Sequence, residues 1–275
     1  MEEIKPVLKW AGGKQNLLSD LNEVFEMFDY KEHCFFDVFT GGGSVSFYLN
    51  NKSTVMNDIN SELINVYNVI KQNPTELICE LKEHKKKHSE SYYYQIRNLD
   101  RNNEYKCMPN IKKAARTIYL NRTCFNGLTR YNKNGFFNVP RGRYKKPSIV
   151  MEDRIIAINK FLNENNVVIL NEDFEAVCER CLKGDLIYFD PPYDYEKNGF
   201  TDYTKEGWSR EDLKRLKELC DKLIYKECHV VISNNDTTYV NELFGNYKIK
   251  HIKAHRFINP KGCNRNNASE VIIYG

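Results

Sequence analysis

Short apolar runs of strand length recur along the chain, and helical patterns separate them; this alternation constrains the fold more than any other feature. The runs are Cys34–Phe39, Thr54–Asn57, Val167–Leu170, Leu186–Phe189 and His229–Ser233. The separating helical patterns include Asn16–Phe28, Phe174–Lys183 and Ser209–Ile224. Buried strands that alternate with helices predict an α/β fold built on an open, mostly parallel sheet. Ligands of such sheets bind at the carboxyl ends of the strands.

Two further segments complete the expected architecture. Lys248–His255 and Glu270–Tyr274 indicate a final antiparallel strand pair. Residues 60–147 interrupt the alternation, with helical periodicity at 60–104 and 111–121. We therefore expect a sheet-containing domain of residues 1–59 and 148–275 and an inserted, mainly helical domain of residues 60–147. His84 and His88 lie four apart among lysines of the insertion, which favours a solvated helix face over a metal pair.

Positive charge is concentrated in the inserted segment. No acidic residue occurs between Glu104 and Glu152, whereas residues 105–151 contain eleven lysines and arginines. The net charge is +4, so the rest of the chain carries −7. A second acid-free stretch, 243–269, contains six more cations, among them Lys253, Arg256, Lys261 and Arg265. A charge run is often only a solvated face, but two long acid-free stretches rich in asparagine, glycine and aromatic residues predict a polyanion partner.

Arginines, asparagines and aromatic residues share the turns in the second half of the insertion. They occupy the glycine-punctuated segments 121–132 and 134–147. Such side chains, presented on loops, suit the reading of base edges and the filling of gaps in a base stack. The expected polyanion is therefore a nucleic acid.

Composition excludes several classes of protein. No apolar run is long enough to cross a membrane. The first residues, Met1–Pro6, carry acids and a proline where a signal peptide needs an apolar region. Nine cysteines without a secretion signal indicate reduced thiols and a cytoplasmic location. The C-x-x-C pair Cys178 and Cys181 has no second pair or histidine near it, so we expect a structural role for it and no metal site.

The turn Lys9–Lys14 is the first of two glycine-rich turns. A P-loop is excluded, because Leu8 stands where the first glycine belongs and Gln15 stands where a hydroxyl should hold magnesium. The turn can still wrap a small ligand with backbone amides, with Lys14 as a charge and Trp10 as an apolar wall.

The second turn, Thr40–Ser44, lies between a strand and a helix start and is typical of nucleotide-binding units, because glycines let a ligand approach the backbone. Ser46 occupies the place of the third glycine of a dinucleotide fingerprint, which argues against NAD. Asp58 ends the next strand, where an acid is placed to accept both ribose hydroxyls of an adenosine.

The tetrapeptide Asp190-Pro191-Pro192-Tyr193 follows the strand Leu186–Phe189. Two prolines fix φ and keep Asp190 out of the helical region, so a carboxylate, rigid carbonyls and an aromatic ring are presented together. This cluster suits a planar amine, whose two hydrogens the carboxylate and the Pro191 carbonyl accept while Tyr193 stacks on its ring. A strand-ending turn with an exposed aspartate is the alternative.

Taken in order, these motifs resemble the Dam-type family (α class, D12) of DNA adenine-N6 methyltransferases over nearly the whole chain. Each motif is common alone, whereas their joint occurrence in this order is specific. The matching motifs are Lys9-Trp10-Ala11-Gly12-Gly13-Lys14, Phe39-x-Gly41-x-Gly43-Ser44, Asn57-Asp58-Ile59-Asn60, Asn126-Gly127-Leu128-x-Arg130-x-Asn132, Phe137-Asn138-Val139-Pro140-x-Gly142-Arg143-Tyr144, Asp190-Pro191-Pro192-Tyr193, Phe200-Thr201-x-Tyr203 and Ser233-Asn234.

The resemblance implies an S-adenosylmethionine-dependent methyltransferase sheet, Rossmann-like, with S-adenosyl-L-methionine as cofactor and a helical target-recognition insert. It implies catalytic roles for Asp190, Pro191, Pro192 and Tyr193 and no metal. The cofactor contacts that it implies are Trp10, Lys14, Asp37, Phe39, Gly41, Gly43, Asp58, Ile59 and Asp190.

The resemblance also implies double-stranded DNA as the substrate, with a flipped-out adenine as the target. Family members closest in the insert methylate adenine in GATC, so GATC is the expected site. Phe125 would wedge into the base stack, Leu128, Arg130, Asn132 and Pro140 would face bases, and Arg143 and Tyr144 would face the backbone. Further expected DNA contacts are Arg116, Arg122 and Asn126.

Two places depart from the family pattern. Thr123-Cys124 replaces residues that vary among relatives, next to the expected wedge. Asp194-Tyr195 follows the tetrapeptide where many relatives carry a proline-containing segment. These departures concern the target-base pocket rather than the chemistry.

Other activities fit the motifs less well. Cytosine-C5 methylation needs a cysteine nucleophile in a Pro-Cys dipeptide, and no proline here precedes a cysteine. A non-catalytic DNA-binding regulator would lack cofactor or carboxylate residues, all of which are present. A methyltransferase of RNA or of protein glutamine could use the same amine chemistry but leaves the Arg130 segment unexplained. Oligomeric state and association with a restriction enzyme stay open.

Overall fold

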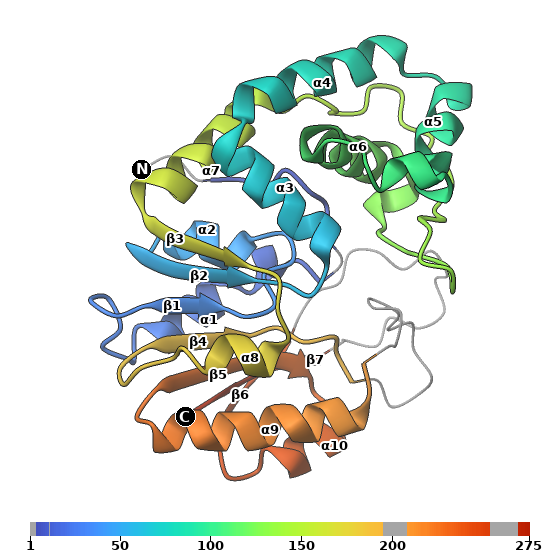
Figure 1. Cartoon of the computed structure of the whole chain (residues 1–275). Helices are drawn as coiled ribbons and strands as arrows, with labels where there is room; N and C mark the ends of the chain where they lie inside the picture. Colours follow the sequence, from blue (N-terminus) through green and yellow to red (C-terminus); the bar gives the residue numbers. More distant parts are fainter. Residues whose placement is uncertain (1–3, 11, 195–207, 254–268) are drawn as a thin grey trace.

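The computed structural model describes residues 4–10, 12–194, 208–253 and 269–275, and its strands form one seven-stranded sheet in the order β3-β2-β1-β4-β5-β7-β6 (Figure 1). Only β7 runs antiparallel to its neighbours, and β6 and β7 form the expected C-terminal hairpin. The predicted S-adenosylmethionine-dependent methyltransferase sheet is therefore confirmed. The strands are β1 (Phe35–Asp37), β2 (Ser53–Asn57), β3 (Asn166–Leu170), β4 (Leu186–Phe189), β5 (His229–Asn235), β6 (Lys248–Lys253) and β7 (Ser269–Tyr274).

The register of the parallel strands brings their carboxyl ends to one edge of the sheet. Asp37, the last residue of β1, pairs with Met56 of β2 on one side and with Tyr188 of β4 on the other. The strand order reverses at β1 and β4, which makes this edge the topological switch point. The segments that follow these three strands therefore begin side by side.

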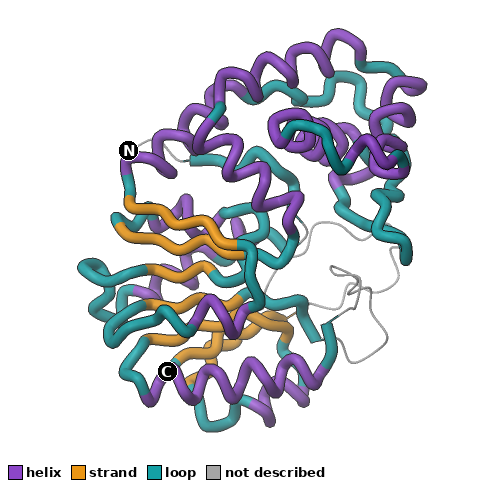
Figure 2. Tube along the Cα trace, in the orientation of Figure 1, coloured by secondary structure: helices purple, strands orange, loops and turns teal. Residues whose placement is uncertain are grey.

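Side chains alternate between the two faces of the sheet, as the period of two requires. Phe36, Ile187 and Val230 belong to one buried cluster, whereas Phe35 and Leu186 belong to another. Both faces are covered by helices, and β4 is accordingly buried along its whole length (Figure 2).

Different helices cover the two faces. On the first face α8 (Phe174–Cys178), α9 (Arg210–Tyr225) and α10 (Thr238–Leu243) supply the apolar side chains. On the second face α1 (Leu18–Phe25) and α2 (Ser44–Leu49) do so. The N-terminus of α9 carries a capping box, because Ser209 and Asp212 each accept from the other's backbone amide.

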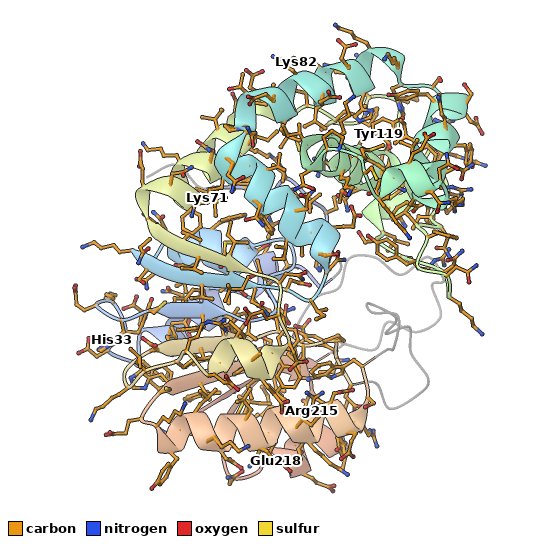
Figure 3. The ribbon with its side chains drawn as sticks, in the orientation of Figure 1. His33, Lys71, Lys82, Tyr119, Arg215 and Glu218 are labelled. Carbon is orange, nitrogen blue, oxygen red and sulfur yellow. The ribbon has the colours of Figure 1, made fainter. Side chains whose placement is uncertain are left out.

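A layer of helices stands beside the sheet edge formed by β3 (Figure 1). It consists of α3 (Ser61–Gln72), α4 (Pro74–Lys87), α5 (Glu90–Arg97) and α6 (Asn110–Thr123). These helices share one apolar core with α7 (Glu152–Glu164) and with Met56 of the sheet. Lys71, labelled in Figure 3, donates to the carbonyl of Val167 at 2.7 Å and joins α3 to β3.

Three local expectations differ from the structure. The helix predicted to reach Lys183 ends at Cys178, and in the segment that follows the Asp185 carboxylate accepts from the Leu182 amide at 2.8 Å. The first helix begins at Leu18, after a 3-10 turn. The solvated face predicted around His84 is wrong at His84 itself, which is 8% exposed and stacks on Tyr119, labelled in Figure 3. Burial lowers the pKa of His84 to about 4.

No helix in the described part of the chain is long and apolar enough to cross a membrane.

Candidate active site

The glycine turn after β1 is closed tightly against Trp10. Gly41 has φ of +49°, and a Cβ there would lie 2.6 Å from Cδ1 of the indole. The Gly41 carbonyl accepts from the hydroxyl of Tyr67 at 2.7 Å, and its amide donates to Asp58 Oδ2 at 3.0 Å. Only glycine permits both this backbone conformation and this approach. The two glycine-rich turns of the sequence are thus brought together.

Asp58 lies at the end of β2, opposite the glycine turn. Its second oxygen accepts from the amide of Asn60 at 2.9 Å, and burial raises the pKa of Asp58 to about 6. The neighbouring Ile59 is 55% exposed, an unusual degree for an isoleucine. A carboxylate and an exposed apolar side chain are what a ribose and an adenine ring require.

Asp37 and Phe39 both precede the glycine turn, at the end of β1. Asp37 is 2% exposed and accepts from the Ser46 hydroxyl at 2.6 Å. Burial raises the pKa of Asp37 to about 7. Phe39 stacks on Phe174 at 5.8 Å and meets Trp208 edge-on at 5.5 Å. Asp37 therefore fixes the turn through its bond to Ser46, and Phe39 forms an aromatic wall.

Lys14 meets the catalytic tetrapeptide predicted from the sequence. Its ammonium lies 2.7 Å from Asp190 Oδ2 and 4.7 Å from the centre of the Tyr193 ring, and its side chain is 5% exposed. Burial raises the pKa of Asp190 to about 6, and the Lys14 charge opposes that rise. The Tyr193 hydroxyl donates to Glu270 Oε2 at 3.0 Å, which fixes the ring against β7.

Two buried polar atoms at this edge lack a hydrogen-bond partner among the described residues. They are Asp190 Oδ1 and Asn234 Nδ2. The carboxamide of Asn234 is oriented by the amides of Asp194 and Asn235, both of which donate to its oxygen. An unsatisfied buried polar group costs about 1–3 kcal/mol. An acceptor and a donor held in this way fit a ligand that supplies both.

The loops of residues 123–144 are built as two short antiparallel ribbons beside α6. In one ribbon, the backbone amide of Phe125 donates to the carbonyl of Pro140 at 2.8 Å, and the amide of Gly142 donates to the carbonyl of Thr123 at 2.8 Å. In the other ribbon, the backbone amide of Asn138 donates to the carbonyl of Arg130 at 3.0 Å. Cys124, one of the departures from the family pattern, is buried, and its backbone forms an isolated antiparallel β-bridge with Arg141. Backbone pairing, rather than a helix, therefore presents these side chains.

Large apolar side chains point outward from this loop. Phe125 is 50% exposed and Leu128 is 39% exposed, although both are of types that normally seek burial. Between them, Asn126 adopts the left-handed conformation with φ of +54°. Gly127 packs so closely on the Lys9 side chain that a Cβ would lie 2.5 Å from Lys9 Cδ. The tight turn pushes both apolar residues towards solvent.

The polar residues predicted to read DNA lie around this apolar pair. Arg130 Nε donates to Asn138 Oδ1 at 2.8 Å, which orients the guanidinium. The Asn132 carboxamide oxygen accepts from Asn134 and Phe136, so this part of Asn132 shapes the hairpin turn. Pro140 and Arg143 are exposed. Arg122 is half-buried and donates to the Ser148 carbonyl. The Tyr144 hydroxyl accepts from the Lys9 ammonium at 3.3 Å.

The predicted DNA contact at Arg116 conflicts with the structure. Arg116 is 4% exposed, and its guanidinium lies 2.8 Å from Asp100 and donates to the carbonyls of Ile96 and Arg97. It holds α5 and α6 together inside the helical layer. A helix rich in lysine and arginine does not show from its sequence which cation points inward.

A clamp between distant residues was not foreseen from the sequence. Asn121 on α6 accepts from the Lys9 amide at 2.8 Å and donates to the Lys9 carbonyl at 2.8 Å. It also donates to the Gly127 carbonyl at 3.1 Å. The loop that carries Trp10 and the loop that carries Phe125 are thus joined through one carboxamide. The separation of 112 residues between the partners leaves no local signal in the sequence.

Some predicted features lie outside the described residues: Tyr195, the Phe200-Thr201-x-Tyr203 motif, and the cations Arg256, Lys261 and Arg265 of the second acid-free stretch. Within the described residues, no group of three or more histidine, cysteine, aspartate or glutamate side chains is arranged to hold a metal. Cys178 and Cys181 are buried in the core under α9.

A sheet of this order, with a glycine turn and Asp190 meeting at its switch point, places the chain among the α/β methyltransferases that use S-adenosylmethionine. The family within this class follows from comparison with known proteins. Residues 10–258 match the model of the D12 class N6 adenine-specific DNA methyltransferases, and the chain belongs to this family. It is therefore an enzyme, an adenine-specific DNA methyltransferase, as the sequence motifs predicted.

Similar proteins extend over nearly the full length. The chain is 39% identical to the type II methyltransferase M1.LlaDCHI of Lactococcus lactis subsp. cremoris, covering 98% of this chain and 95% of that protein. It is 38% identical to the type II methyltransferase M.MjaIII of Methanocaldococcus jannaschii, covering 96% of each. It is 31% identical to the DNA adenine methylase of Escherichia coli (strain K12), covering 99% of this chain and 95% of that protein.

Proposed function

We propose that this enzyme methylates the N6 amine of an adenine that has left the duplex, within the site GATC, at the tetrapeptide Asp190–Tyr193. The observation that carries the proposal is the buried Asp190 Oδ1, which has no partner among the described residues and is held beside the Tyr193 ring. An amine stacked on that ring would supply the missing hydrogen.

The cofactor site is proposed at the two glycine-rich turns. Asp58 would accept the ribose hydroxyls, Ile59 and Phe39 would face the adenine ring, and Trp10 would support the turn at Gly41 and Gly43. Lys14 and Asp190 would face the other end. Asp37, held by Ser46 beneath the turn, would act by shaping it. When bound, S-adenosylmethionine supplies an electrophilic methyl group.

The residues of the tetrapeptide would activate the amine rather than form a covalent bond with it. The lone pair of an adenine amine is delocalised into the ring, which makes the nitrogen a poor nucleophile. Asp190 and the Pro191 carbonyl would accept its two hydrogens and favour a tetrahedral nitrogen with the lone pair released. Pro192 fixes the backbone between them and Tyr193. Fixed acceptors act by orientation and by electrostatic stabilisation.

The target base would have to leave the stack to reach this site. Unstacking costs roughly a few kcal/mol, and stacking on Tyr193 offsets part of it. Phe125, which is 50% exposed on a tight turn, would fill the gap left in the duplex. The surrounding residues Asn126, Leu128, Arg130, Asn132 and Pro140 would face neighbouring bases, and Arg122, Arg143 and Tyr144 would contact the backbone.

We further propose that residues 60–147 form the target-recognition domain and that residues 1–59 and 148–275 form the catalytic domain. The assignment of GATC rests on the resemblance of residues 125–144 to the corresponding segment of the family. The experiment is transfer of a labelled methyl group to a GATC duplex, with 2-aminopurine at the target position in a parallel duplex to report its unstacking. We expect labelled N6-methyladenine and a rise in fluorescence; label without a fluorescence rise would reject base flipping.

A further inference from the structure

Asp194, one of the departures from the family pattern, forms hydrogen bonds through both its side chain and its backbone. Its side chain is 7% exposed. Arg210 donates from Nε to Asp194 Oδ1 at 3.0 Å and from its terminal nitrogen to Oδ2 at 3.2 Å. The Thr237 hydroxyl donates to Oδ2 at 2.9 Å. The carboxylate is thus committed to α9 and to the start of α10.

The backbone of Asp194 is held by the neighbouring strand. Its amide donates to Asn234 Oδ1 at 3.0 Å, and its carbonyl accepts from Asn235 Nδ2 at 2.8 Å. Both asparagines are buried at the carboxyl end of β5. One residue therefore connects the tetrapeptide to β5, α9 and α10.

The tetrapeptide needs such an anchor because of its own composition. The described pairing of β4 with β5 ends at Phe189, which faces Ile232. Pro191 and Pro192 have no amide hydrogen and cannot extend the ladder. The hydroxyl bond from Tyr193 to Glu270 fixes the ring, while the bonds of Asp194 fix the chain next to it.

The ion pair has the properties of a fixed support. Asp194 is buried while Arg210 is 51% exposed, so the pair closes over the strand ends from the solvent side. The guanidinium also lies over the Tyr239 ring at 4.3 Å, which restricts its position. A two-pronged arginine–carboxylate pair imposes a defined geometry as well as an attraction.

We propose that Asp194 is a positioning residue, which acts through the tetrapeptide to set the direction in which Asp190 and Tyr193 face the target amine. Its carboxylate is bonded to Arg210 and Thr237, so it would act through the tetrapeptide and not on the substrate itself. The inference rests on the proposed methyl transfer at Asp190.

The test uses the full chain and three variants. Asp194→Asn keeps the backbone bonds and loses the ion pair, and Arg210→Gln loses the ion pair from the exposed side. Asp185→Asn is the matched control, because Asp185 is also buried and accepts from two amides, those of Cys34 and Leu182, at the opposite end of β4. The measurements are the single-turnover rate of labelled methyl transfer to a GATC duplex, the duplex Kd and the thermal midpoint.

We expect both ion-pair variants to lower the single-turnover rate by about 10- to 100-fold, because a small misplacement at a reacting centre has an effect of that size. The duplex Kd should change by less than about threefold, since no DNA contact is altered. The control should lower the thermal midpoint yet keep the single-turnover rate.

If the unaltered chain transfers the methyl group and both Asp194→Asn and Arg210→Gln transfer it at the same rate, the inference is overturned while the proposed function stands. The same holds if the variants lose rate only to the extent that the control does. No transfer by the unaltered chain would overturn the proposed function and the inference together.

Discussion

The ammonium of Lys14 lies 2.7 Å from Asp190 Oδ2 and faces the Tyr193 ring, whereas Asp190 Oδ1, where the target amine is expected, has no partner among the described residues. The two residues are 176 positions apart in the chain: Asp190 directly follows β4, and Lys14 begins the 3-10 turn before α1. Lys14 therefore compensates the charge of this half-buried carboxylate.

This pair predicts an acid limb in the pH profile. Burial raises the pKa of Asp190 to about 6, and only the carboxylate can accept from the amine, so kcat/KM should fall as pH drops below about 6. Lys14 opposes the rise, so Lys14→Met should move the limb to higher pH. Rates at pH 5 to 9 for both proteins measure it. If the acid limb of Lys14→Met lies at the same pH as that of the wild type, Lys14 does not lower the pKa of Asp190.

Asp190→Ala should remove methyl transfer and keep DNA binding. The variant loses the acceptor that orients the amine, and loss of one preorganised electrostatic group lowers rates by about 100- to 1,000-fold. Labelled transfer and a binding isotherm on the same duplex measure the two effects. Retained activity would sink the proposed chemistry.

Arg130→Ala should relax discrimination at one base pair. Its guanidinium is oriented by Asn138, and a bidentate contact to a base is worth about 1–3 kcal/mol of discrimination. The measurement is the rate on GATC against each single-base variant. Site preference that is identical in variant and wild type would remove Arg130 from the readout.

Salt dependence tests the phosphate contacts of the recognition loops. If about six cations contact phosphates, log affinity should fall against log salt with a slope near −5. Arg143→Met should reduce that slope by about 0.9, whereas Arg116→Met should leave it unchanged because Arg116 is buried against Asp100. A flat salt response, or a slope that changes with Arg116, would contradict the proposed surface.

The sequence predicted the parts of this molecule that depend on local pattern. The strands before Gly41, Asp58 and Asp190 were found from short apolar runs, because buried parallel strands are apolar throughout. The inward direction of Arg116 was missed, because a helix with cations on several faces does not show which face packs. Asn121 and Asp194 acquire partners 112 and 40 residues away, and such contacts depend on the assembled fold.

The family resemblance supplied what the pattern could not. Residue types at strand ends indicated a ligand at the switch point and a planar amine at Asp190, but the amine could have belonged to RNA or to glutamine. The ordered set of motifs selected DNA adenine, and the match of residues 10–258 to the family model confirmed that choice. The burial of Asp190 and its pairing with Lys14 became visible only in the structure.

The most direct test of the account is labelled methyl transfer to defined duplexes, with the modified position mapped. The duplexes are GATC and its single-base variants in one flanking sequence. We expect label on N6 of the adenine in GATC, with each substituted base pair slowing transfer by about 5- to 150-fold, which corresponds to about 1–3 kcal/mol per pair. Equal labelling of all duplexes, or label on any group other than an adenine amine, would contradict it.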